Sequence, residues 1–434
     1  MNKGYKYGSH KKKAIKISDK DLEELSDNTY KNFLDGIRSE QTSSRYSRIL
    51  NYELMEVFDD FFKGSLPQRC DQLVALAKKD NPKTAQIMKS LARKLKARTE
   101  SDPKDENYLN PSSVGNYFKP IKKLFEMNDV PFNWKPIHSI FPDVPRVSFT
   151  KNRGYSKEEI RKMLEFAKGT FDRSLVLMLS SSGMRVGALC ELTWKDVKPV
   201  YEIDGKFREV DEVLESEMPK AKLVCGIVVI YKGSSSEGFA FITPEAYESL
   251  ISWKSEYKKL VMHTPKEEDP IFINYQKPHE KKFSKVWSVS RRIDNLLEKA
   301  GIATKLPKGV RRRTTPKTNG FRYYFNNIIK NTHSEDSNLA QLIKTEFMMN
   351  HTGIAKHDRN YFKANVMELV KEYVKSVLQL TISKEIESQQ ELISKQKKIE
   401  ELELVKDEVM KDYEERISRL ERLIRKDTMK KQEE

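Results

Sequence analysis

The sequence predicts a mainly helical α+β protein: a helical N-terminal domain, a larger mixed domain with a small antiparallel sheet, and a C-terminal coiled-coil helix. Apolar residues recur every three or four positions over most of the chain, which places them on one face of a helix. Two short runs, residues 223–231 and 239–242, are instead rich in Val, Ile and Phe, which favours strands. With 434 residues the chain is longer than a usual single core, so we expect two domains with additions.

The first 135 residues are predicted to form a basic arm and a small helical domain. Residues 1–17 contain six lysines and no acidic residue, which fits a flexible arm that lies on phosphates and equally a solvated tail. Residues 18–135 have helical spacing, and a helix that begins after Asn110 contains Pro120, which should kink it. The apolar positions expected to face this core are Tyr30, Phe33, Leu34, Ile37, Leu50, Leu54, Val57, Phe58, Phe61, Ile87, Leu91 and Leu95.

A proline-rich stretch, residues 136–155, is predicted to link this domain to a second one over residues 156–380. Ser156 and Glu159 have the spacing of a capping box, which opens a helix. Apolar residues at helical spacing continue from there, so we expect mostly helices as far as Val197.

The middle of the second domain is predicted to contain its sheet. An acidic segment, residues 201–218, is expected to be an insertion before the strands. The two strands then form a hairpin with Lys232 at its bend. A further short strand is expected over residues 270–275. Helices are expected over residues 246–260, 286–300, 319–329, 339–349 and 366–377.

Residues 381–434 are almost free of Gly and Pro and dense in Glu, Lys, Leu and Ile, which predicts a coiled-coil helix. Because a long helix survives poorly without a partner, we expect self-association, with a solvated amphipathic helix as the alternative. Ile399, Leu402 and Val409 lie in one phase, and a shifted heptad is kept by Met410, Tyr413, Ile417, Leu420 and Ile424.

The charge of the chain indicates an acidic macromolecular partner. Lys and Arg number 80 and Asp and Glu 64, which gives a net charge of +16 and a pI near 9.3. Nucleic acid is the expected partner, and an anionic membrane surface is the competing one. No apolar run approaches the roughly 20 residues of a spanning helix, so we expect a soluble, cytoplasmic, nucleoid-associated protein. The three cysteines are scattered without a CxxC, which argues against a disulfide framework and a zinc site.

Two basic clusters are candidate DNA-binding residues. One lies on the polar faces of the helix around residues 87–95, and the other precedes the helix that begins near residue 319. Charged faces of this kind suit a surface that lies along a duplex, although most such faces are only solvated. The candidates are Lys89, Arg93, Lys94 and Lys96 in the first cluster, and Arg311, Arg312, Arg313 and Lys317 in the second.

Arg185 is the residue that most needs an explanation. It lies in an apolar pattern, S-S-S-G-M-R-V-G-A-L-C-E-L-T-W, so its guanidinium needs a core carboxylate, helix-end carbonyls or an external anion. Further on, N-G-F-R, which ends at Arg322, opens a helix whose free N–H groups and dipole add to the arginine in attracting an anion. The second arginine favours the anion as the partner of the first.

Six residues occur in order at wide separation: Arg185, Lys232, Asn319, Arg322, His351 and Tyr361. Their order and local frames resemble those of the tyrosine recombinase (phage integrase) family over residues 27–380. The resemblance implies that residues 18–135 are a helical core-binding, DNA-binding domain and that residues 156–380 are the catalytic domain. The frames Y-K-G around Lys232, N-G-F-R before the second arginine and N-Y-F-K around Tyr361 are most similar to archaeal members of this family.

The resemblance implies that DNA strands are cleaved and rejoined through a 3′-phosphotyrosine and a Holliday junction, without a metal or cofactor. Tyr361 would attack the scissile phosphate, and Arg185 and Arg322 would hold the charge of the transition state. Lys232 would protonate the leaving 5′-oxygen, and His351 would donate a hydrogen bond to the phosphate. Because the phosphotyrosine keeps the bond energy, rejoining needs no ATP.

Three positions depart from the family pattern. Asn319 stands where many members have His, so its amide would donate a hydrogen bond but would not transfer a proton. Asn350 replaces the glycine that usually precedes the histidine, here His351. Ala188 replaces a common glutamate that contacts the first arginine, and Glu191 is the candidate substitute.

The resemblance also implies double-stranded DNA attachment sites as the partner and a homo-oligomer that is a tetramer in the synaptic complex. A type IB topoisomerase would use the same phosphotyrosine step but would relax DNA as a monomer. The coiled coil after Tyr361 favours the recombinase. A catalytically retired DNA-binding protein of this family is the third interpretation, because of Asn319 and Asn350.

Overall fold

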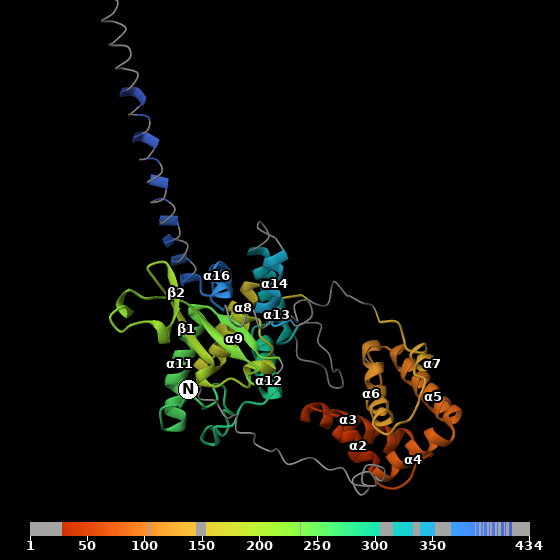
Figure 1. The fold of residues 1–434 in the computed structure, drawn as a ribbon. Coiled ribbons are helices and arrows are strands. Elements are labelled where there is room, and N and C mark those ends of the chain that lie inside the picture. The colour runs from red at the N-terminus through yellow and green to blue at the C-terminus, as the bar shows by residue number, and fades with distance from the viewer. Residues whose placement is uncertain are drawn as a thin grey trace, which may run out of the picture. The chain divides into compact units, whose positions relative to one another are not determined.

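The computed structural model divides into two compact units near residue 147. Both units are mostly helical, and the second also contains a small antiparallel sheet, so the predicted mainly helical α+β class is confirmed (Figure 1). The residues that the structure describes are 28–102, 105–144, 153–234, 236–303, 316–332, 339–351, 366–386 and parts of 388–418.

The first unit is a set of helices around one apolar core. Phe33, Leu50, Leu54, Leu73 and Ile121 are fully buried at its centre, and most of the apolar positions expected from the sequence face this core. Its elements are α2 (Thr29–Asp35), α3 (Glu40–Tyr52), the π-helical η1 (Glu53–Val57), α4 (Leu66–Lys79), α5 (Asn81–Thr99), the 3₁₀ turn η2 (Pro111–Ser113), α6 (Val114–Glu126) and α7 (Lys135–His138).

The π-helical turn η1 changes which residues after it face the core. Its hydrogen bond runs from the Phe58 N–H to the Glu53 carbonyl (2.8 Å), and the wider turn rotates the positions that follow. Phe62 is therefore buried, whereas Phe61, predicted to face the core, is 53% exposed. The same turn buries the carboxyl group of Glu53, and this burial raises its pKa well above the ordinary value.

The first core extends further along the chain than the sequence suggested. Ile137 is buried in it, and Ile140 and Phe141 pack against it. Tyr155 is already buried in the second core. The linker predicted over residues 136–155 was therefore too long at both ends.

The second unit is built on a four-stranded antiparallel sheet with the strand order β2-β1-β3-β4. The predicted hairpin is present as β3 and β4, with Val228 opposite Ala240. The acidic segment 201–218 is not a simple insertion, because it completes β1 and supplies β2. Some of its acidic groups pair with cations: Lys198 pairs with Asp211 (2.5 Å), and Arg208 pairs with Glu217 (3.0 Å). The strands are β1 (Val197–Ile203), β2 (Lys206–Glu209), β3 (Lys222–Ile230) and β4 (Gly238–Ile242).

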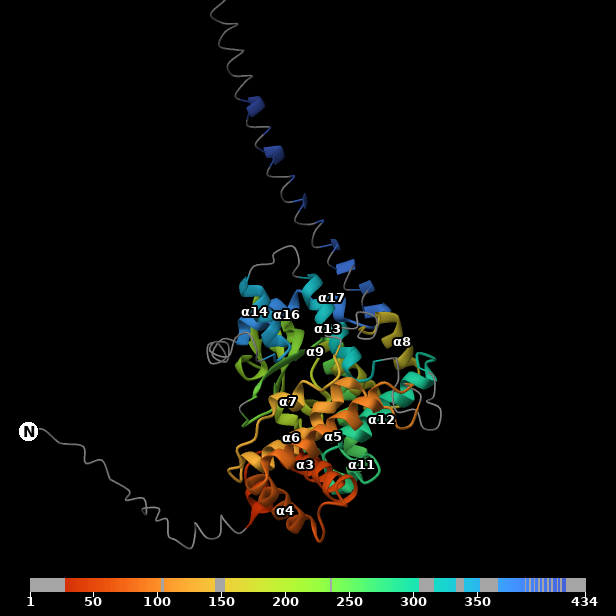
Figure 2. The same cartoon turned by 90° about the vertical axis from the view of Figure 1, so that its right-hand side faces the viewer.

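Helices pack on this sheet and on one another, and residues 270–275 form only isolated bridges at Pro270 and Ile273 instead of the expected strand. Helices α11 and α16 contact β3, and α13 contacts both α9 and α14 (Figure 2). The helices are α8 (Lys157–Glu165), α9 (Thr170–Ser182), α10 (Val186–Leu189), α11 (Pro244–Val261), α12 (Val286–Lys299), α13 (Asn319–Thr332), α14 (Leu339–Met348), α16 (Val366–Val374) and α17 (Val377–Leu380). Short 3₁₀ turns are η3 (Trp194–Asp196), η4 (Val210–Glu212), η5 (Met218–Lys220) and η6 (Pro278–Glu280).

The described residues between 384 and 418 are helical, as predicted for the tail. Its apolar side chains are exposed at Leu392, Ile393, Ile399, Leu402, Val409, Met410, Tyr413 and Ile417. The coiled coil itself stays a prediction, because it concerns a second chain. Among the helices in the described part of the chain, none is both long enough and apolar enough to cross a membrane.

Candidate active site

Four of the six predicted catalytic residues line one pocket of the second unit. The pocket has a volume of about 290 Å³ and lies where the start of α10, the start of α13 and the end of α14 meet. It is lined by Arg185, Asn319, Arg322, Tyr323, Asn326, Met349 and His351. Two guanidinium groups and an imidazole thus share one space, and none of the described residues that line it is a carboxylate.

Arg185 lies just after a sharp end of α9. Gly183 ends that helix with a φ of 58°, and a Cβ there would lie 2.5 Å from the Phe325 ring, so only glycine fits. The backbone then becomes extended at Arg185, whose side chain is exposed although Ala188 beside it is fully buried. Within the described residues no carboxylate forms an ion pair with Arg185; Glu191, the candidate substitute, is exposed and pairs with neither arginine. An external anion is therefore the partner that this geometry favours.

Arg322 is held by backbone carbonyls at the ends of two helices. Its guanidinium donates to the Gly183 carbonyl (2.7 Å), at the end of α9, and to the Met349 carbonyl, at the end of α14. Both carbonyls lie at the negative ends of helix dipoles, which favour a cation. Burial, and after it the charge of Arg185, lowers the pKa of Arg322 to about 10. The carbonyls orient the guanidinium without neutralising it, so its full charge is available to a ligand.

Tyr155 fixes the start of α13 through hydrogen bonds to the backbone there. The Tyr155 hydroxyl donates to the Pro316 and Lys317 carbonyls (2.9 Å to the latter), and its N–H donates to the Gly320 carbonyl (3.2 Å). A Cβ at Gly320 would lie 2.4 Å from the Tyr155 ring, so glycine is required between Asn319 and Arg322. Lys317, a predicted DNA contact, is exposed and pairs with Asp294 (2.9 Å).

His351 has a partner that the sequence did not reveal. Its Nδ1 atom lies 2.7 Å from Oε2 of Glu346, five residues earlier on α14. Because an ionised carboxylate can only accept, Nδ1 carries the hydrogen of this bond, and Nε2 is the ring nitrogen left for a ligand. A glutamate five residues before a histidine is not a signal on its own, so the sequence did not point to Glu346.

Lys232 lies at the bend between β3 and β4, as predicted, but it does not line the pocket. Its Nζ atom lies 3.3 Å from Oδ1 of the buried Asp196, and its side chain is 56% exposed. The other oxygen of Asp196 accepts from the N–H (2.8 Å) and the hydroxyl (2.6 Å) of Thr193, so the carboxylate is fixed in place. Tyr361 lies outside the described residues, as do Arg311, Arg312 and Arg313.

In the first unit, α5 presents the predicted basic face. Arg93, Lys94 and Lys96 are exposed and Lys89 is half-buried, while the apolar side of the helix faces the core. Sequence reasoning missed a second basic area, a hollow of about 580 Å³ on the same unit. It is lined in part by Arg45, Arg48, Tyr52, Arg98 and Tyr117. The only signal was the spacing of Arg45 and Arg48, three apart on one helix.

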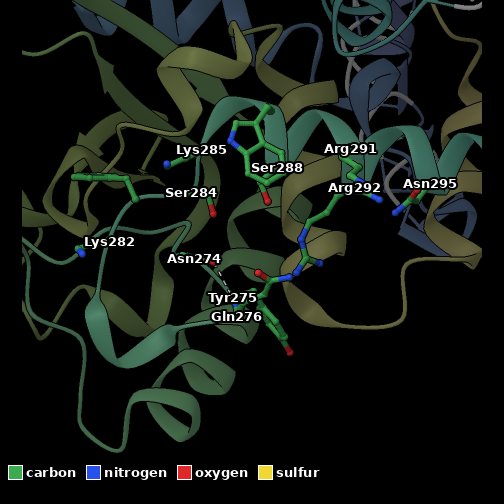
Figure 3. Close-up of a pocket in the computed structure, with 12 residues that line it drawn as sticks. Asn274, Tyr275, Gln276, Lys282, Ser284, Lys285, Ser288, Arg291, Arg292 and Asn295 are labelled. Atoms are coloured by element: carbon green, nitrogen blue, oxygen red, sulfur yellow. Dashed lines mark hydrogen bonds between the residues drawn. The ribbon is translucent and has the colours of Figure 1, made fainter. Parts of the chain in front are cut away.

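A further pocket of about 520 Å³ lies beside α12 in the second unit. Figure 3 shows Arg292 extending from this helix toward Tyr275. Its guanidinium pairs with Asp172 (2.8 Å) and lies over the rings of Phe171 (4.6 Å) and Tyr275 (4.9 Å). Lys285 and Arg291 at the rim are exposed, as is Trp287 (64%).

No protein-family model and no curated protein sequence matches the chain. Several solved structures do match it. They are recombinases and integrases. XerA recombinase is 14% identical, with 80% of this chain and 98% of that chain covered and a TM-score of 0.31. XerH site-specific recombinase bound to palindromic difH substrate, in a post-cleavage complex, is 16% identical. The match covers 81% of this chain and 97% of that chain, with a TM-score of 0.42. A lambda integrase dimer bound to a COC′ core site is 10% identical, with 79% and 92% covered and a TM-score of 0.38. All three TM-scores are below 0.5, so the function rests on this chain's own residues.

Proposed function

We propose that the chain is a site-specific DNA recombinase that cleaves and rejoins strands through a 3′-phosphotyrosine on Tyr361. The observation that carries this proposal is the pocket. Residues from three distant stretches, namely Arg185, Asn319 with Arg322, and His351, line one space. Two arginines in a described lining without a carboxylate suit a phosphate, because each guanidinium can donate to two phosphate oxygens.

In the proposed reaction, the scissile phosphate occupies this pocket. The Tyr361 hydroxyl releases its proton to solvent as its oxygen bonds to phosphorus, and the bond from phosphorus to the 5′-oxygen breaks as Lys232 protonates that oxygen. Arg185 and Arg322 neutralise the charge on the non-bridging oxygens. Nδ1 of His351 is bonded to Glu346 (2.7 Å), so Nε2 is the ring nitrogen left to donate to the phosphate.

Duplex DNA is the proposed partner, and three basic surfaces support it. They are the exposed face of α5, the hollow beside Arg45 and Arg48, and the rim of the α12 pocket at Lys285 and Arg291. Phosphate contacts of this kind position a protein on DNA. The exposed apolar residues of the tail support self-association, and the local frames around Lys232 and Arg322 support an archaeal-type integrase.

A nicked suicide duplex that carries a candidate site tests the enzyme. We expect a covalent protein–DNA adduct on denaturing gels that is lost in Tyr361→Phe and kept in Tyr323→Phe, a pocket tyrosine used as the matched control. The absence of an adduct on every cognate site would instead support a DNA-binding protein without catalysis. Relaxation of supercoils by a monomer without site preference would support the topoisomerase.

The tail is tested separately by light scattering. Deletion of residues 385–434 should lower the oligomer mass, because it removes the exposed apolar stripe of the helix. An unchanged mass would show that the tail does not assemble the protein.

A further inference from the structure

Helix α14 ends in a motif that requires an unusual backbone conformation at Asn350. The His351 N–H donates to the Glu346 carbonyl (2.9 Å), and the Asn350 N–H donates to the Phe347 carbonyl (2.8 Å). This pair of bonds is a Schellman motif, and it places Asn350 in the left-handed region with a φ of 49°. Glycine is the usual residue there, and asparagine is among the few others that accept the conformation.

The Asn350 side chain reaches the turn of the β3–β4 hairpin. Its Nδ2 atom donates to the Ser236 carbonyl (3.3 Å). Its Oδ1 atom lies 3.0 Å from the point where a Cβ at Gly238, the first residue of β4, would be. The amide therefore packs tightly against the second half of the turn, a contact that glycine at this position would lack.

The turn itself has a defined shape. The Ser234 N–H donates to the Tyr231 carbonyl (3.0 Å), and the Gly233 N–H donates to a carboxylate oxygen of Glu237 (2.7 Å). Tyr231 and Gly233 both have positive φ, 55° and 74°, on either side of Lys232. The Ser236 N–H also donates to the Ser234 hydroxyl (3.1 Å), so these bonds connect the second half of the turn to the half that carries Lys232, and an anchor on Ser236 restrains both.

We propose that Asn350 is a positioning residue that fixes the hairpin turn to the end of α14, so that Lys232 is held in register with His351 and the scissile phosphate. The inference rests on the proposed recombinase function. Asn350 is followed directly by His351, and one residue thereby connects the helix end that carries the histidine with the turn that carries the lysine. The asparagine that departs from the family pattern then has a role of its own.

The test uses a substrate that does not need the lysine. A duplex whose scissile bond has sulfur in place of the 5′-oxygen releases a thiolate, which leaves without being protonated. Asn350→Gly keeps the left-handed conformation and removes the amide. We expect Asn350→Gly to cleave the ordinary duplex about tenfold more slowly, as loss of one positioning bond implies, and the sulfur duplex at nearly the wild-type rate.

Two comparisons make the result specific. Lys232→Ala should show the same pattern with a larger loss. Lys344→Ala removes an α14 side chain that pairs with Glu372 (3.1 Å) instead of the hairpin, and it should cleave both duplexes normally. Thermal unfolding checks that each variant is folded.

Two outcomes for Asn350→Gly would overturn the positioning role: equal losses on both duplexes, or no loss on either. If the wild type cleaves neither duplex, the recombinase proposal fails and the positioning role fails with it. If the wild type cleaves both duplexes and the rates of Asn350→Gly fall equally on both, only the positioning role is overturned.

Discussion

The pocket around Arg322 and the pocket beside α12 both contain a half-buried arginine, but the two arginines have different partners. Arg322 is bonded to the Gly183 and Met349 carbonyls, and its pKa is lowered because it is buried and lies near Arg185. Arg292 is paired with a carboxylate, that of Asp172, and sits over two aromatic rings.

Under the proposed function, this difference distinguishes an arginine that binds the phosphate from one that stabilises the fold. A carboxylate neutralises a guanidinium and leaves little attraction for another anion, whereas carbonyls orient it and leave its charge in place. Arg322 accordingly has an unsatisfied charge facing a second cation, a state that a bound phosphate would relieve. Arg292 stabilises the packing of α12 on α9.

The largest expected effect is that of Arg322→Ala. We expect the single-turnover cleavage rate on the suicide duplex to fall about 10³-fold, because transition-state charge loses a preorganised donor. Arg322→Lys should recover little of this rate, because an ammonium cannot fork between the two carbonyls and the phosphate. Near-wild-type cleavage by Arg322→Ala would show that this pocket does not take part in the reaction.

Arg292→Ala should lower the stability of the protein and leave its cleavage rate almost unchanged. We expect the free energy of unfolding to fall by about 1–3 kcal/mol, because a half-buried Asp172 loses its partner and two rings lose a cation. Cleavage at saturating DNA should stay close to that of the wild type. Denaturant unfolding and single-turnover cleavage, measured on the same preparation, check the two halves of this prediction.

A smaller effect is expected where a carboxylate acts on the site through another residue. Glu346→Gln should slow cleavage about tenfold at unchanged DNA affinity, because His351 loses the charged partner that fixes its Nδ1 hydrogen. The matched control is Lys330→Ala, which removes the more distant ion pair to Glu346 (3.8 Å) and should leave the rate unchanged. Equal effects of the two variants would argue against an orienting role.

The sequence was informative where function depends on side chains in recognisable frames, and silent where it depends on backbone. Arg185, Arg322 and His351 were found by their frames, and the structure brings them to one pocket. The carbonyls that hold Arg322 carry no residue signature, so no pattern could identify Gly183 as an acceptor. Strands β1 and β2 were missed because the charges of an exposed sheet edge mask the alternation of a strand.

The comparison extends to a buried carboxyl group in the first core, that of Glu53. Both of its carboxyl oxygens lack a hydrogen-bond partner in the described part of the chain, and burial raises its pKa well above the ordinary 4.5. The folded state therefore binds a proton that the unfolded state releases, so this group costs stability as the pH rises above about 4.5. Glu53→Gln should raise the unfolding free energy by about 1 kcal/mol at neutral pH and less near pH 4, as measured by denaturant unfolding at both values.

The most direct test of the central claim is whether the Arg185–Arg322 pocket binds a phosphate-like anion. Thermal unfolding with orthovanadate would be measured for the wild type, Arg185→Ala and Arg292→Ala. We expect vanadate at ten times its Kd to stabilise the wild type and Arg292→Ala by about 1.4 kcal/mol. Arg185→Ala should show little stabilisation by vanadate, although without the anion it should gain stability because Arg322 loses a repulsive neighbour. Equal stabilisation of all three proteins would contradict the assignment of this pocket as the phosphate site.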